Sequence, residues 1–332
     1  MTNILDLELN ELRKSLPNFR SGQVFSWLSK GVKSFDDMTN IPKDLREELK
    51  SEFEIDLPET VTLQESKIDG TKKFLFELKD GNRIESVFMK YKFGNSICVS
   101  SQAGCRMGCK FCASTIKGLE RNLTAGEIYG EVLKVMIETG ETISHIVIMG
   151  TGEPFDNYNN VAKFIRIVND KQGLNIGMRN ITVSTCGIVP MIDKFGDDFD
   201  QVNLAISLHH VTNESRSNLM PINKKYPIEE VLEAVNRYTK KTNRRVTFEY
   251  TLVKDTNDRK EDALKLASLL NGMLCHVNLI PLNQVAETGL KTTDKDTAIN
   301  FQKTLESKGI PATIRRELGD DIDAACGQLR LK

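Results

Sequence analysis

The sequence lacks an excess of either charge. Its 45 Lys and Arg residues balance 46 Asp and Glu residues, which leaves a formal net charge of −1. Proteins that attract nucleic acid through a general electrostatic field are usually strongly basic. Any RNA site on this chain therefore has to be local, formed by a few Lys and Arg residues.

The sequence also lacks long hydrophobic runs, internal repeats and low-complexity segments. No apolar run approaches the roughly 20 residues that cross a bilayer, and residues 1–19 contain acidic side chains but no signal-peptide core. We therefore expect a cytoplasmic protein with no membrane partner. Seven cysteines in that compartment are more often ligands or catalysts than a disulfide framework.

The chain divides into three parts by its hydrophobic patterns. Residues 1–60 have helical periodicity interrupted by Pro17 and Pro42, which predicts a small helical domain of RNA-binding type. Its interspersed basic residues favour an ordinary solvated helix face over an RNA-binding surface. Residues 61–95 contain two alternating runs separated by Asp80 and Gly81, which predicts a β-hairpin linker.

Residues 96–332 alternate between strand-like apolar runs and amphipathic segments of helical length, which predicts an α/β fold built as a partial (β/α)6 barrel. Chemistry in such barrels sits at the C-terminal ends of the strands. The expected strands are residues 97–100, 145–149, 181–184, 202–208, 246–252, 276–281 and 312–315, and the expected helices are residues 124–139, 157–170, 227–240, 259–272 and 295–308.

Three cysteines follow the first barrel strand in a C-x3-C-x2-C pattern, at Cys105, Cys109 and Cys112. Structural zinc sites use four protein ligands, whereas iron–sulfur clusters are held by closely spaced thiolates. Buried thiols or a zinc site are the alternatives, but glycines and polar residues between the cysteines are not a core pattern. With Phe111 before the third cysteine, the loop resembles that of radical S-adenosylmethionine (SAM) enzymes.

Polar groups follow several other strands. Gly152 and Glu153 come after the second, where a backbone could approach a ligand and a carboxylate could accept from a cation. A tight turn is the alternative interpretation of the glycines, and loop caps are the alternative for the polar residues after later strands. Those later residues are Ser184, Ser207, Leu208, His209 and Asn283.

A seventh cysteine, Cys326, lies in a Gly- and Asp-rich segment near the chain end. It is either a packing residue or a nucleophile that reaches the barrel mouth. With this segment added, the chain resembles the RlmN/Cfr family of radical SAM RNA methyltransferases. The resemblance covers residues 25–45, 98–112, 121–124, 149–154, 205–209, 220–223, 278–281 and 319–329.

The resemblance implies a role for each matching residue. Cys105, Cys109 and Cys112 would hold a [4Fe-4S] cluster, while Cys326 would carry a methyl group as S-methylcysteine. Cys98 would release the product through a transient disulfide with Cys326. Glu85 would accept a proton from the adenine. The SAM contacts would be Gly152, Glu153, Ser184, Ser207, Leu208, His209 and Asn283, whereas Cys186 and Cys275 match no family role and are expected to be structural.

The activity implied is methylation of adenine C2 in 23S rRNA, at the peptidyl transferase centre, and in tRNA, next to the anticodon. It would use two SAM molecules per turnover and an electron donor such as flavodoxin or ferredoxin. A C8-methylating branch of the family shares the cysteines, but it tends to carry Ala after Glu153, so Pro154 favours C2. A redox-sensing iron–sulfur RNA-binding protein is an alternative of another class, which would need neither Cys326 nor Glu85.

Overall fold

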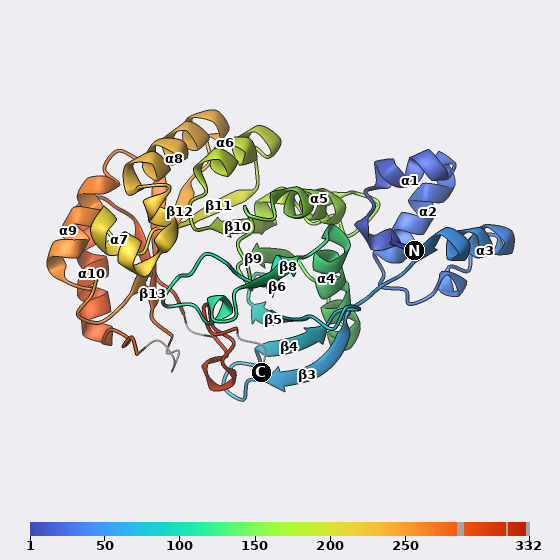
Figure 1. The fold of residues 1–332 in the computed structure, drawn as a ribbon, viewed down its shortest axis with the longest axis horizontal. Helices are drawn as coiled ribbons and strands as arrows, with labels where there is room; N and C mark the ends of the chain where they lie inside the picture. Colours follow the sequence, from blue (N-terminus) through green and yellow to red (C-terminus); the bar gives the residue numbers. More distant parts are fainter. Residues whose placement is uncertain (284–288, 317, 330–332) are drawn as a thin grey trace.

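The computed structural model describes residues 1–283, 289–316 and 318–329. Its main feature is one ten-stranded mixed sheet with helices against it, and a group of short helices lies at one end of the molecule (Figure 1). Within the described residues, no helix combines the length and apolar character that crossing a membrane requires.

The N-terminal helices form as the proline positions predicted. α2 (Asn18–Leu28) begins directly after Pro17 and α3 (Lys43–Glu52) directly after Pro42, because proline fits the start of a helix but not its interior. They follow η1 (Ile4–Asp6) and α1 (Leu9–Ser15), and β1 (Thr2–Asn3) pairs with β2 (Phe53–Glu54). Figure 1 shows these helices beside α4 and α5 of the larger part.

The residues expected to form a hairpin linker instead extend the main sheet. β3 (Glu59–Glu65), β4 (Lys72–Glu77) and β5 (Arg83–Tyr91) pair antiparallel, and β5 pairs with β6 (Gly94–Val99), the first barrel strand. Gly81 has a φ of 82° in the β4–β5 turn, as the Asp-Gly pattern predicted. The meander therefore belongs to the same sheet as the barrel, a long-range pairing that local pattern does not show.

Seven parallel strands make the barrel part of the sheet, in the order β14-β13-β12-β11-β10-β9-β6. Within the described residues this sheet does not close on itself, so the predicted partial barrel is confirmed. After β6 the strands are β9 (His145–Ile148), β10 (Ile181–Thr185), β11 (Asn203–Ser207), β12 (Val246–Leu252), β13 (Cys275–Pro281) and β14 (Ala312–Ile314).

Helices connect successive strands, and all five predicted ones are confirmed within three residues at each end. The sequence patterns missed α6 and α7, which are short. A two-stranded ribbon, β7 (Gln102–Gly104) with β8 (Leu119–Asn122), carries the cysteine loop away from β6. The helices are α4 (Ala125–Thr139), α5 (Tyr158–Asn169), α6 (Val189–Asp198), α7 (Asn213–Leu219), α8 (Ile228–Thr242), α9 (Lys260–Leu269) and α10 (Lys295–Ser307).

Candidate functional site

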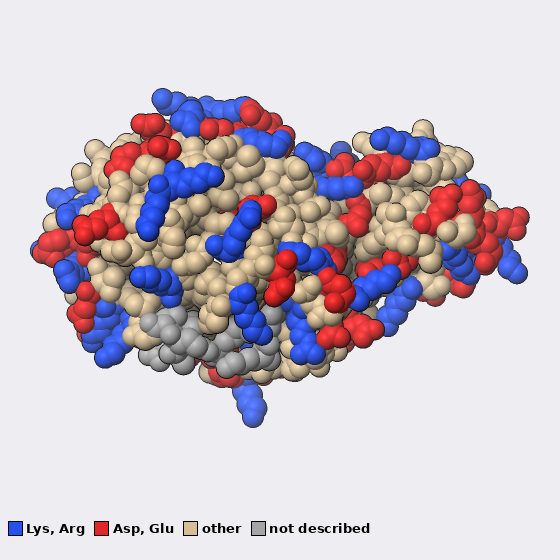
Figure 2. Space-filling view, in the orientation of Figure 1, with Lys and Arg blue, Asp and Glu red and all other residues tan. Residues whose placement is uncertain are grey.

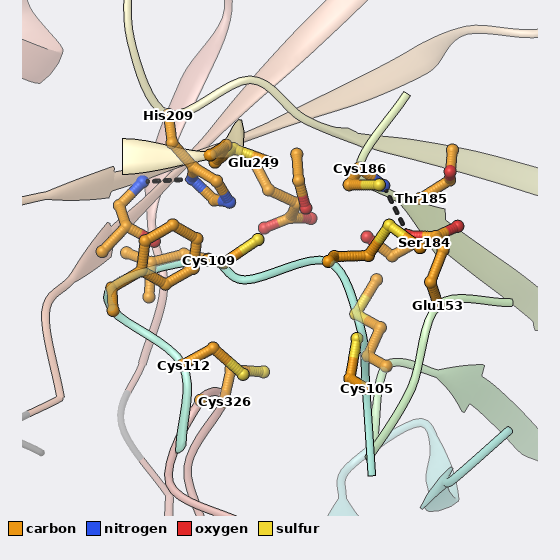
Figure 3. Close-up of a pocket in the computed structure, with 18 of the residues that line it drawn as sticks. Cys105, Cys109, Cys112, Glu153, Ser184, Thr185, Cys186, His209, Glu249 and Cys326 are labelled. Carbon is orange, nitrogen blue, oxygen red and sulfur yellow. Dashed lines mark hydrogen bonds between the residues drawn. The ribbon is translucent and has the colours of Figure 1, made fainter. Parts of the chain in front are cut away.

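A large pocket opens at the C-terminal ends of the parallel strands, where barrel chemistry was expected. It collects residues from the cysteine loop, from the turns after β9 to β11, from β12 and from the C-terminal segment. Figure 3 shows their side chains around one open space. The predicted site residues that line it are Cys105, Cys109, Cys112, Gly152, Glu153, Ser184, Ser207, His209, Asn283 and Cys326.

The backbone of the cysteine loop depends on glycine. Gly104 has a φ of 75°, and a Cβ added there would overlap the carbonyl oxygen of Gly118. That oxygen accepts a hydrogen bond from the Cys105 amide at 2.8 Å, which closes the base of the loop. Gly108, with a φ of 71°, makes the next turn. The loop can therefore turn tightly enough to direct three thiols into one pocket.

The three loop thiols border a space instead of touching at a point (Figure 3). Among the described residues no three His, Cys, Asp or Glu side chains already form a site for a single metal ion. Burial raises the pKa of Cys105 to about 12 and also raises the pKa of Cys109 and Cys112. Iron would deprotonate these thiols on binding, so an all-sulfur set around an open space fits an iron–sulfur cluster.

Glu153 lies across the pocket with its carboxylate held by backbone amides. The amides of Phe155 and Cys186 donate to its two oxygens at 2.9 and 2.8 Å. Burial raises the pKa of this carboxyl group in spite of those bonds. Gly152 before it has a φ of 110°, and an added Cβ would lie 2.6 Å from the Cβ of Gln102. Glycine is thus required where the chain turns toward the pocket.

His209 contributes a neutral ring. Its Nδ1 accepts a hydrogen bond from the Thr251 amide at 2.9 Å (Figure 3), so the ring proton resides on Nε2. Burial, with a smaller effect from Arg216, lowers the pKa of His209 to about 3. The ring packs edge-on against Phe111 of the cysteine loop, with centroids 4.7 Å apart. This histidine is therefore suited to donating a hydrogen bond and not to carrying charge.

Arg216 is fully buried beneath the strand ends, and the sequence analysis missed it. It donates to the backbone oxygens of Cys186 at 2.8 Å, Ser207 at 3.0 Å and Leu208 at 3.0 Å, and to Asn223 Oδ1 at 2.9 Å. The sequence of α7 does not indicate that Arg216 is buried, because the groups it bonds to lie in turns that are distant in the chain. One guanidinium thus fixes the ends of β10 and β11 together.

Leu208 does not contribute a side chain to the pocket, in contrast to the neighbouring predicted residues. Its side chain is fully buried in the hydrophobic core, and its backbone bonds to Arg216 and Glu249. Cys186, expected to be structural, lines the pocket instead and supports Glu153 through its amide. Cys275 is buried at the first residue of β13, at the opposite end of the strand.

The C-terminal segment, residues 318–329, brings Cys326 to the pocket. Arg315 Nη1 donates to the Cys326 sulfur at 2.8 Å, and Asn283 Nδ2 donates to its carbonyl oxygen at 3.0 Å. The amide of Ala113 donates to the Gly327 carbonyl at 2.8 Å, directly after the cysteine loop. The segment that carries the last cysteine is therefore fastened to the loop that carries the other three.

Cys98 and Glu85 lie beneath that C-terminal segment and are not among the described residues that line the pocket. Cys98 packs with Ala324 and Leu329 in a small apolar cluster. Burial, and the neighbouring thiol of Cys326, raise the pKa of Cys98. Glu85 is fully buried 3.6 Å from the ammonium of Lys73, which also donates to the carbonyl oxygen of Asp323. Residues of the C-terminal segment therefore cover both side chains.

Comparison with known proteins gives matches along the whole chain. The model of the radical SAM superfamily matches residues 99–267, and that of the ribosomal RNA large subunit methyltransferase N-terminal domain matches residues 2–55. The chain is 55% identical over 335 residues to a probable dual-specificity RNA methyltransferase RlmN of Clostridium botulinum (strain Eklund 17B), covering 99% of this chain and 96% of that protein.

Two further relatives agree. A probable dual-specificity RNA methyltransferase RlmN of Bacillus subtilis (strain 168) is 53% identical over 339 residues, which is 99% of this chain and 93% of that one. The crystal structure of a radical SAM methyltransferase from Sphaerobacter thermophilus superposes with a TM-score of 0.95 at 43% identity and covers 100% of both chains.

Proposed function

The chain belongs to the RlmN family of radical SAM RNA methyltransferases, and from this premise we propose that it methylates adenine C2 in 23S rRNA and in tRNA. The observation that carries the proposal is that Cys326 lines the same pocket as Cys105, Cys109 and Cys112. A cluster site alone would serve many reactions, but a further thiol at the same pocket suits an enzyme that carries a methyl group on sulfur.

When bound, the [4Fe-4S] cluster and SAM supply a methyl group and a 5'-deoxyadenosyl radical. Cys105, Cys109 and Cys112 would hold the cluster, and Gly152, Glu153, Ser184, Ser207, His209 and Asn283 would border SAM, with Leu208 contributing through its backbone. Two molecules of SAM per turnover, an electron donor such as flavodoxin or ferredoxin and a cytoplasmic location belong to the same proposal.

Three residues of the chain would each carry out one step of the methyl transfer to adenine. The Cys326 sulfur would receive the methyl group and present its carbon to the base, since an amidine carbon is too poor a nucleophile for polar methylation. Glu85 would take the proton from C2. The Cys98 sulfur would then attack the Cys326 sulfur. An S–S bond forms as the bond from the Cys326 sulfur to the product carbon breaks, and that carbon takes the electron pair and a proton to become the methyl group of the freed base. The position of Cys98 under the C-terminal segment supports this pairing.

Local basic residues support an RNA substrate despite the balanced net charge. Exposed Lys and Arg residues flank the pocket-lining positions, and Figure 2 shows Lys and Arg side chains across the middle of this face. Contacts from such residues to phosphates would position RNA without reading its sequence. The residues concerned are Arg106, Lys110, Lys117, Lys224, Lys225 and Arg316.

Mass spectrometry of nucleosides tests the proposal. RNA incubated anaerobically with the enzyme, SAM and a reductant should yield 2-methyladenosine, whereas 8-methyladenosine would assign the other branch of the family. Cys326→Ala should abolish the product and Cys98→Ala should trap a protein–RNA adduct. Cys275→Ala, a buried cysteine away from the pocket, is the matched control and should stay active. Product formed by Cys326→Ala would exclude the thiol carrier.

Iron analysis tests the cluster ligands separately. Cys109→Ala should lose most of the iron that the wild-type protein binds after anaerobic reconstitution, because a cluster needs all three thiolates here. The Cys275→Ala control should retain it. Full iron loading in the Cys109 variant would contradict the ligand assignment.

A further inference from the structure

A second, smaller cleft adjoins the main pocket and is also bordered by Cys326. It is lined by the side chains of Met89, Tyr91, Arg315 and Arg316 among others, and it shares Cys326 with the main pocket. The carrier thiol therefore borders both the site proposed for SAM and a cleft that has no assigned occupant.

One face of β5 leads into this cleft. Alternate residues of a strand share a face, so Glu85, Val87, Met89 and Tyr91 follow one another toward the edge of the molecule. Val87 and Met89 pack under the C-terminal segment, while Tyr91 is only partly buried at its rim. The proposed proton acceptor and the cleft thus lie along a single row of side chains.

The row ends in an aromatic stack. The ring of Phe93 lies on the ring of Tyr91 with centroids 4.8 Å apart and planes 10° apart, and the rings of Phe93 and His145 meet edge to face with centroids 5.0 Å apart. Phe93 is nonetheless 66% exposed. A single exposed phenylalanine needs no explanation, but an ordered aromatic stack that adjoins a reactive thiol presents a π surface to any flat ligand.

The stack is held in place by its backbone. Gly94, directly after Phe93, has a φ of 134°, and a Cβ added there would overlap the Ser144 hydroxyl. The amide and hydroxyl of Ser144 both donate to the carbonyl oxygen of Asn95 at 3.0 Å. The turn that carries Phe93 is therefore anchored to the chain before β9, so the ring is positioned before a ligand arrives.

We propose that Tyr91 and Phe93 form a stacking platform for an unpaired RNA nucleotide next to the adenine that Cys326 methylates. Arg316 is exposed and lines the cleft together with Tyr91, and the exposed Lys92 lies between the two aromatic residues in the chain, so cations are available for a phosphate backbone. An apolar protein partner would need a broad hydrophobic patch, whereas two rings beside two cations match the aromatic and cationic surfaces that bind single-stranded RNA.

This inference rests on the proposed function, because it takes RNA as the substrate. Binding of an RNA stem-loop, measured by fluorescence anisotropy without turnover, tests it independently of methylation. Removing a base-stacking aromatic weakens binding by about 5- to 150-fold, so Phe93→Ala should weaken it within that range. Phe93→Tyr should bind as the wild type does, and Leu274→Ala, which removes another exposed apolar side chain at the start of β13, is the control.

Phe93→Leu separates stacking from hydrophobic contact. Leucine keeps an apolar side chain but has no π face, so it should bind as weakly as the alanine variant. Methylation of Cys326 by SAM, followed by intact protein mass, should be unchanged in every variant because it needs no RNA. Equal RNA binding by wild type, Phe93→Ala and Phe93→Leu overturns the platform. Full rescue by leucine also overturns it, in favour of an apolar partner.

The two proposals fail in different ways. Wild-type protein that makes no methylated adenosine refutes the proposed function, whatever the binding measurements show. Wild-type protein that methylates RNA, with Phe93→Ala binding within about two-fold of it, refutes only the platform.

Discussion

Replacement of Arg216 by methionine removes one guanidinium that bonds to four acceptors at 3.0 Å or less. Hydrogen bonds from a charged donor contribute about 1.5–3 kcal/mol each, but they are not additive, and burying the charge opposes them. Breaking a buried charged network typically costs about 3–5 kcal/mol. We expect Arg216→Met to lower the free energy of unfolding by about that amount.

Native proteins have about 5–15 kcal/mol of stability, so the variant should still fold at room temperature. Its thermal unfolding midpoint, measured by circular dichroism, should fall by about 4–7 °C, because the entropy of unfolding grows with chain length. The carbonyl groups that lose this partner lie at the ends of β10 and β11, next to Ser184 and Ser207, which border the pocket. Because these strand ends would be held less firmly, SAM affinity measured by equilibrium dialysis should fall at least roughly ten-fold. Arg216→Lys should be intermediate, because an ammonium cannot reach all four acceptors.

Arg237→Met is the matched control. Arg237 pairs with Asp193 through two bonds of 2.8 Å, but its side chain is 52% exposed. Exposed pairs contribute little to stability, so this variant should unfold close to the wild-type temperature. Equal unfolding midpoints and equal SAM affinities for the Arg216 and Arg237 variants would refute the argument that Arg216 organises the strand ends.

Three further predictions concern other buried groups. Burial raises the pKa of Glu131, so the folded protein holds this proton more tightly than the unfolded chain does, and stability should fall as pH rises above about 4.5. Glu131→Gln should make the free energy of unfolding, measured by urea titration at successive pH values, depend less on pH. An unchanged pH dependence would contradict this. Arg315→Gln should slow methylation of the Cys326 sulfur, followed by intact protein mass, roughly 10- to 100-fold, because it removes the 2.8 Å hydrogen bond that orients this sulfur. Arg315→Lys should restore part of the rate, and a wild-type rate in Arg315→Gln would contradict the prediction. Gly104→Ala should destabilise the cysteine loop by about 1 kcal/mol or more and lower iron loading, because the added Cβ meets the Gly118 carbonyl; wild-type iron content would contradict it.

The elements of the barrel were largely predictable because their signals are local. All seven predicted barrel strands are present, and the expected helix at residues 124–139 forms as α4, with Thr124 capping it through the Glu127 amide. The helices α6 and α7 were missed, and α7, with seven residues, is too short to show a clear helical period. The hairpin at Asp80 and Gly81 was predicted, but its pairing with the barrel through β5 and β6 was not.

The sequence by itself determined the family and the chemistry-bearing residues, because a C-x3-C-x2-C loop and a lone C-terminal cysteine are local patterns whose residue types already limit what they can do. The domain boundaries and residue roles inferred from it stay predictions. Only the tertiary structure decided which of these residues meet. It brings Cys326 to the loop 214 positions earlier that contains Cys112, and it places Arg315 and Arg216 against groups from distant turns. Such contacts arise when the sheet is assembled, so no stretch of sequence carries a signal for them.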